Sequence, residues 1–193
     1  MYPIILASGS PRRKQLLEWA EVPFEVLAKE TAETHPPGLE LEDIPVHIAR
    51  AKAAAVQEEA GAALVILAAD TVVVIDGQII GKPRDPADAV RILSLLSGRE
   101  HRVITGVVVI RGDRERSFSE TTDVSFHALS QEQIRFYVDK YKPFDKAGAY
   151  AIQEWIGVVG IKSIRGDFYN VMGLPVSRVV QLLAAFEAED QLG

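Results

Sequence analysis

The chain has 193 residues, of which 48% are hydrophobic and 25% are charged, a composition typical of a globular protein and not of a disordered or fibrous one. Its net charge of −6 argues against binding of DNA or RNA, because surfaces that bind a nucleic-acid backbone are usually basic. It contains no cysteine, no apolar run near the ~20 residues of a membrane span and no signal-peptide pattern, so we expect a soluble cytoplasmic protein without disulfides or thiolate metal sites.

The first half of the chain predicts alternating strands and helices. The expected strands span residues 3–7, 24–27 and 63–76, and the expected helices span 11–20 and 44–60. Ser10 and Pro11 are typical of a helix start, and the polar stretch 29–42 is typical of a surface loop. The run 63–76 is almost continuously apolar and β-branched, which predicts a buried central strand.

The second half continues this alternation. The expected helices span 86–97, 131–141 and a last segment from Pro175, and the expected strands span 101–110 and 117–129, joined by a turn at 111–114. Ser130 and Gln133 form a capping box. The stretch 77–86 reads as turns, and 143–170 as short extended pieces between glycines. Because one pair of strands reads as a hairpin, the sequence predicts an α/β protein with a mixed sheet in a single domain.

The strongest single signal is Asp70, which interrupts the apolar run "LAADTVVV". An ionised carboxylate in such a strand is costly unless it is paired, hydrogen-bonded or bound to a metal. Asp70 could therefore bind a divalent cation or deprotonate a water molecule. The alternative is a structural aspartate that caps a neighbouring loop, and the position favours the functional role.

A second candidate is "SGSPRR", residues 8–13, where a predicted strand passes into a predicted helix. The start of a helix attracts anions, and hydroxyls and guanidinium groups suit phosphate oxygens. Ser8, Ser10, Arg12 and Arg13 could therefore bind phosphate. Taken alone, the pattern favours the simpler interpretation of a well-capped helix with two solvated arginines.

The remaining candidates carry weaker local signals. The stretch 77–83 is superficially similar to a Walker A loop, but its spacing is one residue short and Pro83 replaces the magnesium-binding hydroxyl, so we reject it. Lys82 then reads as a loop lysine, and Lys52 and Glu33 as solvated charges. The glycine-punctuated stretches "DKAGAYAIQE" and "NVMGLP" could line a site, although most such stretches are turns. The histidines show no metal-ligand spacing.

Taken together, these segments resemble one protein family. In order, they are "ASGSPRRKQLL", Glu33, "IARAKA", "AADTVV", "GKPRDPADAVRIL", "HRVITGV", "KAGAYAIQ" and "NVMGLP". This set resembles the Maf family of nucleoside triphosphate pyrophosphatases from Ile4 to about Phe186. The resemblance implies one domain over residues 1–193, with two lobes around a central cleft. It also implies a mixed, twisted β-sheet with flanking helices, similar to inosine triphosphate pyrophosphatases.

The resemblance also implies a reaction. A nucleoside triphosphate and water would give the monophosphate and pyrophosphate, with a divalent cation such as Mg²⁺ or Mn²⁺. Asp70 matches the proton acceptor, and Glu33 and Asp70 are the implied metal ligands. The positions that serve phosphates, metal and catalysis are matched by Ser8, Arg13, Glu33, Lys52, Asp70 and Lys82.

Substrate choice is implied in the same way. Arg12, Thr71 and Gln153 match the trio of the branch that acts on dTTP and UTP, with modified pyrimidine nucleotides as further options. The amide of Gln153 could pair with N3–H and a carbonyl of uracil or thymine, and equally with guanine, so the trio carries the pyrimidine prediction. The chain departs from many members at Ala32, where Asp is common, and at Glu154, where Gly is common. The first bears on metal binding and the second on the base pocket.

Two other functions stay open. One is a nucleotide-binding regulator of septum formation and cell division without turnover, and the other is a Maf enzyme for methylated guanine nucleotides. Carboxylates near a polyanion repel it unless a metal intervenes, so Asp70 and Glu33 favour the enzyme, and the specificity trio disfavours guanine. We expect a small nucleotide as the partner, neither nucleic acid nor membrane, and the sequence leaves a homodimer open.

Overall fold

The computed structural model describes residues 3–190, which alternate strands and helices largely as expected. In chain order the elements are β1 (Ile4–Leu6), α1 (Pro11–Trp19), β2 (Phe24–Val26), α2 (Asp43–Ala60), β3 (Ile66–Ile75), β4 (Gln78–Ile80), α3 (Pro86–Leu96), β5 (Glu100–Arg111), β6 (Arg114–Phe126), α4 (Gln131–Tyr141), the 3-10 helix η1 (Ala147–Ala149), α5 (Trp155–Gly160), β7 (Ile161–Arg165), α6 (Phe168–Met172) and α7 (Val176–Asp190). None of the described helices is long and apolar enough to cross a membrane.

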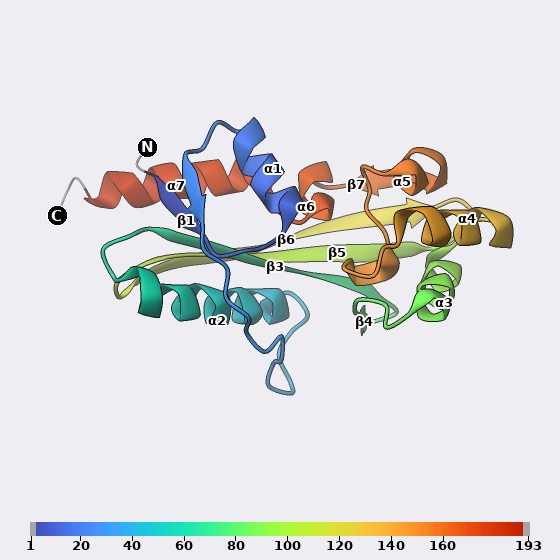
Figure 1. The fold of residues 1–193 in the computed structure, drawn as a ribbon, viewed down its shortest axis with the longest axis horizontal. Coiled ribbons are helices and arrows are strands. Elements are labelled where there is room, and N and C mark those ends of the chain that lie inside the picture. Colours follow the sequence, from blue (N-terminus) through green and yellow to red (C-terminus); the bar gives the residue numbers. More distant parts are fainter. Residues whose placement is uncertain (1–2, 191–193) are drawn as a thin grey trace. The chain divides into compact units, whose positions relative to one another are not determined.

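Within residues 3–190, seven strands form one mixed sheet (Figure 1). The strand order is β2-β1-β3-β5-β6-β7, and β4 pairs with β3 outside this path. β1 is parallel to β2 and β3, whereas β4 is antiparallel to β3 and β7 is antiparallel to β6. The expected α/β class, with a mixed sheet and flanking helices, is confirmed.

The described chain divides into two compact units. Of the described residues, the first unit comprises 3–70, 105–120 and 173–190, and the second comprises Thr71–Ile104 and Thr121–Met172. The boundaries after residues 70, 104 and 120 fall inside β3, β5 and β6. Each of these strands therefore contributes residues to both units.

In the first unit, α2 packs on one face of the sheet, and α1 and α7 lie on the other side (Figure 1). The small side chains of Ala49 and Ala53 are fully buried and allow a close approach of this helix to β3. Gly106 on β5 allows α2 to lie directly against that strand, because a Cβ at Gly106 would lie 2.2 Å from the backbone nitrogen of Val46 on α2. The buried cluster beneath α2 consists of Ile5, Ala7, Ala49, Ala53, Val56, Ile66, Ala68, Val108 and Ile110.

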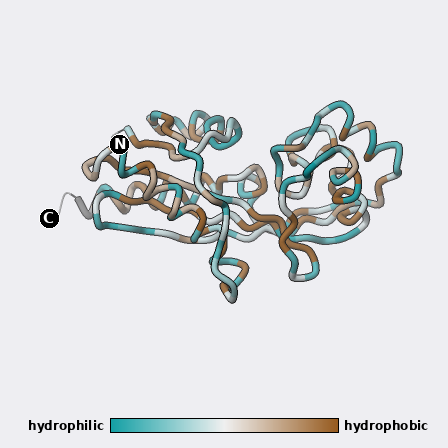
Figure 2. The backbone as a smooth tube through the Cα atoms, turned by 60° about the horizontal axis from the view of Figure 1, so that its bottom comes forward, coloured by the Kyte–Doolittle hydropathy of each residue, from teal (hydrophilic) through white to brown (hydrophobic). Residues whose placement is uncertain are grey.

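In the second unit, α3 packs against α4 and η1. Asn170 is fully buried, and its amide donates to the Val103 carbonyl at 3.1 Å and to the Thr122 hydroxyl at 3.0 Å. These bonds tie α6 to β5 and β6, so Asn170 has a structural role rather than lining an open loop. Figure 2 shows apolar stretches along the strands, with hydrophilic residues recurring on the helices.

The structure corrects three expected elements. The turn-rich stretch 77–86 contains β4, which folds back on Val73–Ile75. The strand expected at 117–129 runs instead from Arg114 to Phe126, because the turn after β5 occupies only residues 112–113. The stretch 143–170 contains the short helices α5 and α6 in addition to β7.

Two helix starts were also predicted. The capping box of Ser130 and Gln133 at the start of α4 is confirmed. Ser10 does occupy the N-cap of α1, but its side chain makes no capping hydrogen bond. Its own N–H donates to the Ser8 hydroxyl at 3.2 Å.

Candidate active site

Asp70 lies within β3 and is only 7% exposed. The preceding residues, Ala68 and Ala69, are fully buried, so the strand carries the carboxylate into an apolar environment. The ammonium Nζ of Lys52 donates to Asp70 Oδ1 at 2.6 Å. This ion pair supplies the partner that a buried carboxylate requires.

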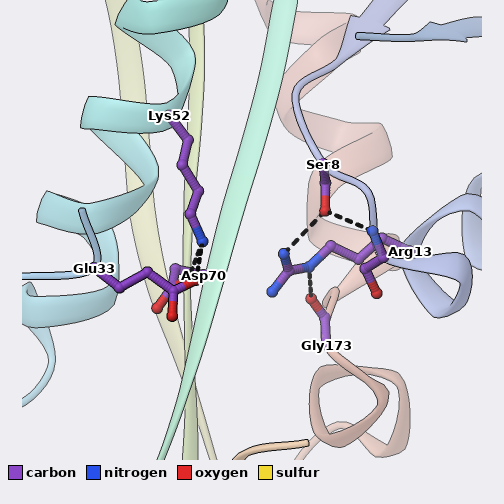
Figure 3. A network of polar contacts seen from close by, with 7 residues as sticks. Ser8, Arg13, Glu33, Lys52, Asp70 and Gly173 are labelled. Carbon is purple, nitrogen blue, oxygen red and sulfur yellow. Dashed lines mark hydrogen bonds and ion pairs between the residues drawn. The ribbon is translucent and has the colours of Figure 1, made fainter. Parts of the chain in front are cut away.

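Lys52 also bonds a second carboxylate. Its Nζ lies 2.9 Å from Oε1 of Glu33, which belongs to the loop between β2 and α2 (Figure 3). The Lys52 side chain is 15% exposed and that of Glu33 is 45% exposed. The local interpretation of Lys52 as a solvated helix lysine is therefore wrong. Because the alanine face of α2 packs close to β3, the four-carbon stem of Lys52 reaches Asp70.

Arg13 forms a second polar group in the same unit (Figure 3). It is 8% exposed, its Nε donates to the Gly173 carbonyl at 2.8 Å, and its Nη1 donates to the Ser8 hydroxyl at 3.2 Å. The interpretation of both arginines as solvated is wrong for Arg13, while Arg12 is half-buried. A bonded guanidinium is fixed in direction, which suits recognition of phosphate oxygens.

The charge of Arg13 is coupled to the carboxylates. Burial lowers the pKa of its guanidinium, and the negative charges of Asp70 and Glu33 act in the opposite direction, while Arg12 lowers it further. Three cations, Arg12, Arg13 and Lys52, thus share one electrostatic environment with Asp70 and Glu33 in the first unit. A polyanionic ligand would add the negative charge that Arg13 and Lys52 can balance.

Lys82, Thr71 and Gln153 belong to the second unit. Thr71 follows Asp70 on β3 and is half-buried, whereas Lys82 and Gln153 are exposed. Lys82 lies in the loop between β4 and α3, and Gln153 in the turn before α5.

Asp88 holds the loop that carries Lys82. Its Oδ2 accepts from the backbone N–H of Arg84 at 3.1 Å, and its Oδ1 accepts from Arg91 Nε at 2.8 Å. These two bonds lower the pKa of Asp88 to about 2, so the carboxylate stays ionised near neutral pH. The loop is therefore anchored to the first turn of α3.

A divalent cation such as Mg²⁺ binds through several oxygen ligands. Among residues 3–190, no group of three or more histidine, aspartate or glutamate side chains could hold a metal alone. Mg²⁺, however, keeps several waters and is often held by one or two carboxylates together with substrate phosphates. Glu33 and Asp70, bridged by Lys52, fit such an open arrangement. Ala32 is exposed and adds no further carboxylate to it.

The sequence does not reveal the partner that holds Arg13. The Gly173 carbonyl accepts from Arg13 Nε, and the only local signal for this residue is the glycine of "NVMGLP".

Comparison with known proteins identifies the family. The family model described as Maf-like protein matches residues 3–186. The chain belongs to the Maf family. The match includes each site residue named above, from Ser8 to Gln153.

Two named proteins are similar to this Maf chain over most of its length. It is 51% identical to a dTTP/UTP pyrophosphatase of Cytophaga hutchinsonii over 180 residues, which are 93% of this chain and 82% of that protein. It is 46% identical to a dTTP/UTP pyrophosphatase of Porphyromonas gingivalis W83 over 188 residues, which are 96% and 94% of the two chains. These relatives cover almost the whole of the Maf chain.

Among solved structures, the Staphylococcus aureus Ham1 protein is similar. The alignment covers 98% of this Maf chain and 100% of that protein, with a TM-score of 0.51 and 16% sequence identity. At this identity the likeness concerns the fold alone. It agrees with the fold that the resemblance implied.

Proposed function

We propose that this Maf protein hydrolyses dTTP and UTP to the nucleoside monophosphate and pyrophosphate, by attack of water on the α-phosphorus. The observation that carries the proposal is the position of Lys52, whose ammonium bonds both Asp70 and Glu33 in the unit that also buries Arg13. Relatives 51% and 46% identical carry the name dTTP/UTP pyrophosphatase, which supports the same substrates here.

The positively charged side chains would stabilise the negative charge that develops on the departing pyrophosphate. The departing pyrophosphate gains negative charge in the transition state, and fixed donors aimed at that charge lower the barrier. Ser8 and Gly173 hold the Arg13 guanidinium in place, so this side chain would need to move little during the reaction. We assign Arg13 and Lys52 to the phosphates, with Lys82 as a further cation.

The carboxylates would serve the attacking water. Asp70 would orient the water and accept its proton at a carboxylate oxygen, with Glu33 beside it. Glu33 and Asp70 are the residues that would hold a divalent cation such as Mg²⁺ or Mn²⁺. When bound, this cation would neutralise part of the triphosphate charge. Lys52 would keep the two carboxylates in place.

The base would be chosen by other side chains. Gln153 offers an amide donor and an acceptor, which match the N3–H and a carbonyl of uracil or thymine. The residues proposed to select the nucleotide are Arg12, Thr71 and Gln153. The relatives' names do not favour either of the two other functions. These are a regulator without turnover and an enzyme for methylated guanine nucleotides.

A panel of nucleoside triphosphates tests this proposal. The purified protein is incubated with Mg²⁺ and each triphosphate, and pyrophosphate and orthophosphate are measured separately. We expect pyrophosphate from dTTP and UTP as the first product, with lower rates for purine nucleotides. Orthophosphate as the first product would indicate cleavage at the γ-phosphorus and refute the proposal.

A further inference from the structure

The turn that carries Gln153 is closed by one side chain from another helix. Glu154 N–H donates to the Ala151 carbonyl at 3.1 Å, which places Ile152 and Gln153 at the two central positions of a four-residue turn. Ala151 and Ile152 are buried, whereas Gln153 is exposed. Among the described residues, the Gln153 amide has no hydrogen-bond partner, so it is available to a ligand.

Tyr137 joins the first and last residues of this turn. Its hydroxyl accepts from the Ala151 N–H at 3.1 Å and donates to Oε2 of Glu154. Tyr137 is fully buried on α4, and its ring stacks on Tyr141 with centroids 5.0 Å apart. One buried oxygen atom therefore fixes both ends of the segment that presents Gln153.

Glu154 is held from two further directions. Its Oε1 lies 3.9 Å from Nζ of Lys146. Its carbonyl accepts from the N–H of Gly157 at 2.9 Å at the start of α5. A Cβ at Gly157 would lie 1.7 Å from the Ile152 carbonyl oxygen, so the helix backbone presses directly on the turn. The turn thus has little freedom to move.

We propose that Tyr137 and Glu154 are positioning residues for nucleotide selection, which act by fixing the turn that presents Gln153. This inference rests on the proposed function, in which Gln153 contacts the base. Recognition by an amide depends on the placement of its donor and acceptor to within fractions of an ångström.

The test compares selectivity, defined as kcat/KM for UTP divided by kcat/KM for CTP or GTP. Tyr137→Phe removes the hydroxyl alone, and we expect selectivity to fall about 5- to 30-fold, the effect of one or two hydrogen bonds. Glu154→Ala should act similarly, whereas Glu154→Gln keeps a carbonyl acceptor for the Tyr137 hydroxyl and should retain most of the selectivity. Tyr141→Phe is the matched control, because among residues 3–190 its hydroxyl has no hydrogen-bond partner.

A double-mutant cycle separates positioning from a general structural role. In a Gln153→Ala background, Tyr137→Phe should leave selectivity unchanged, because the residue through which it acts is gone. An equal loss with and without Gln153, or an unchanged selectivity in Tyr137→Phe alone, would overturn the inference. Dissociation constants for the same nucleotides, measured by calorimetry without divalent cation, give a second ratio. The proposed function fails if the unmodified protein releases no pyrophosphate, and the binding ratios still decide the role of Tyr137.

Discussion

Lys52 Nζ lies 2.6 Å from Oδ1 of Asp70, which joins the middle of α2 to the middle of β3. The strand buries Asp70, and the helix supplies the cation that a buried carboxylate requires as a partner. The second carboxylate on the same ammonium, Glu33, comes from a loop. The three side chains therefore form a small charged group that depends on three separate segments of the chain.

The first prediction concerns Asp70. Asp70→Asn keeps the shape of the side chain but removes the proton acceptor, and we expect the rate to fall by ~10²–10⁴ while the protein still folds. The rate is measured as pyrophosphate release from dTTP, and folding by circular dichroism. The control is Asp76→Asn, which alters an exposed carboxylate paired with Arg99 and should leave the rate unchanged. Wild-type activity in Asp70→Asn would remove Asp70 from the mechanism.

The second prediction separates the two roles of Lys52. Lys52→Met leaves the buried carboxylate of Asp70 without its cation, so the free energy of unfolding should fall by about 3 kcal/mol and turnover should be lost. The double variant Lys52→Met with Asp70→Asn should recover stability without activity. Urea denaturation measures stability, and Lys14→Met, at an exposed pair with Glu18, is the control. Recovered activity in the double variant would contradict the assignment.

The third prediction concerns the geometry of Arg13. Arg13→Lys retains a positive charge but cannot donate to both Gly173 and Ser8 in the planar arrangement of a guanidinium. We expect kcat/KM for dTTP to fall roughly 10- to 100-fold, the effect of lost hydrogen bonds to a charged group. Arg50→Lys changes an exposed bidentate pair with Glu115 and should have little effect. Equal kcat/KM values for the two variants would argue against a fixed role for Arg13.

The fourth prediction concerns stability against pH in the second unit. His101 is buried against the rings of Phe126 and Tyr150, with Nε2 2.7 Å from the Tyr150 oxygen, and burial lowers its pKa to about 4. The unfolded chain would take up a proton at a pKa of about 6.5. The neutral ring therefore contributes stability that is complete above pH 6.5 and is lost as the pH falls toward 4.

The size of this effect follows from the difference between the two pKa values. The loss should reach about 3 kcal/mol near pH 4, and it can be followed by urea denaturation between pH 7 and pH 4. In His101→Phe the part of the pH dependence that belongs to this ring should disappear. An identical decline in the variant would show that other groups cause it.

Much of the fold could be predicted because the long elements carry local signals. β3 is apolar and β-branched on both sides of Asp70 and Thr71, and α4 begins with a capping box. β4, by contrast, has three residues and is defined by its pairing with β3, which no short pattern encodes. The helices α5 and α6 are also only six and five residues long, too short for a periodic sequence pattern to predict them.

Some residues of the candidate site could likewise be predicted from local sequence, whereas others depend on contacts made only in the fold. Asp70 could be found from the sequence because a charge within an apolar strand is anomalous wherever it occurs. Lys52 looks like any helical lysine until the alanine face of α2 brings it to β3. The burial of Arg13 depends on a carbonyl 160 residues away, at Gly173, so local reasoning could not reveal it.

The measurement that tests the central claim most directly is hydrolysis of dTTP in water enriched in ¹⁸O. Attack on the α-phosphorus and attack on the β-phosphorus give the same two products, so product analysis alone does not separate them. Attack at the α-phosphorus would place one ¹⁸O atom in the monophosphate and none in the pyrophosphate, which is the result we predict for both dTTP and UTP. Label found in the pyrophosphate would contradict the proposed mechanism.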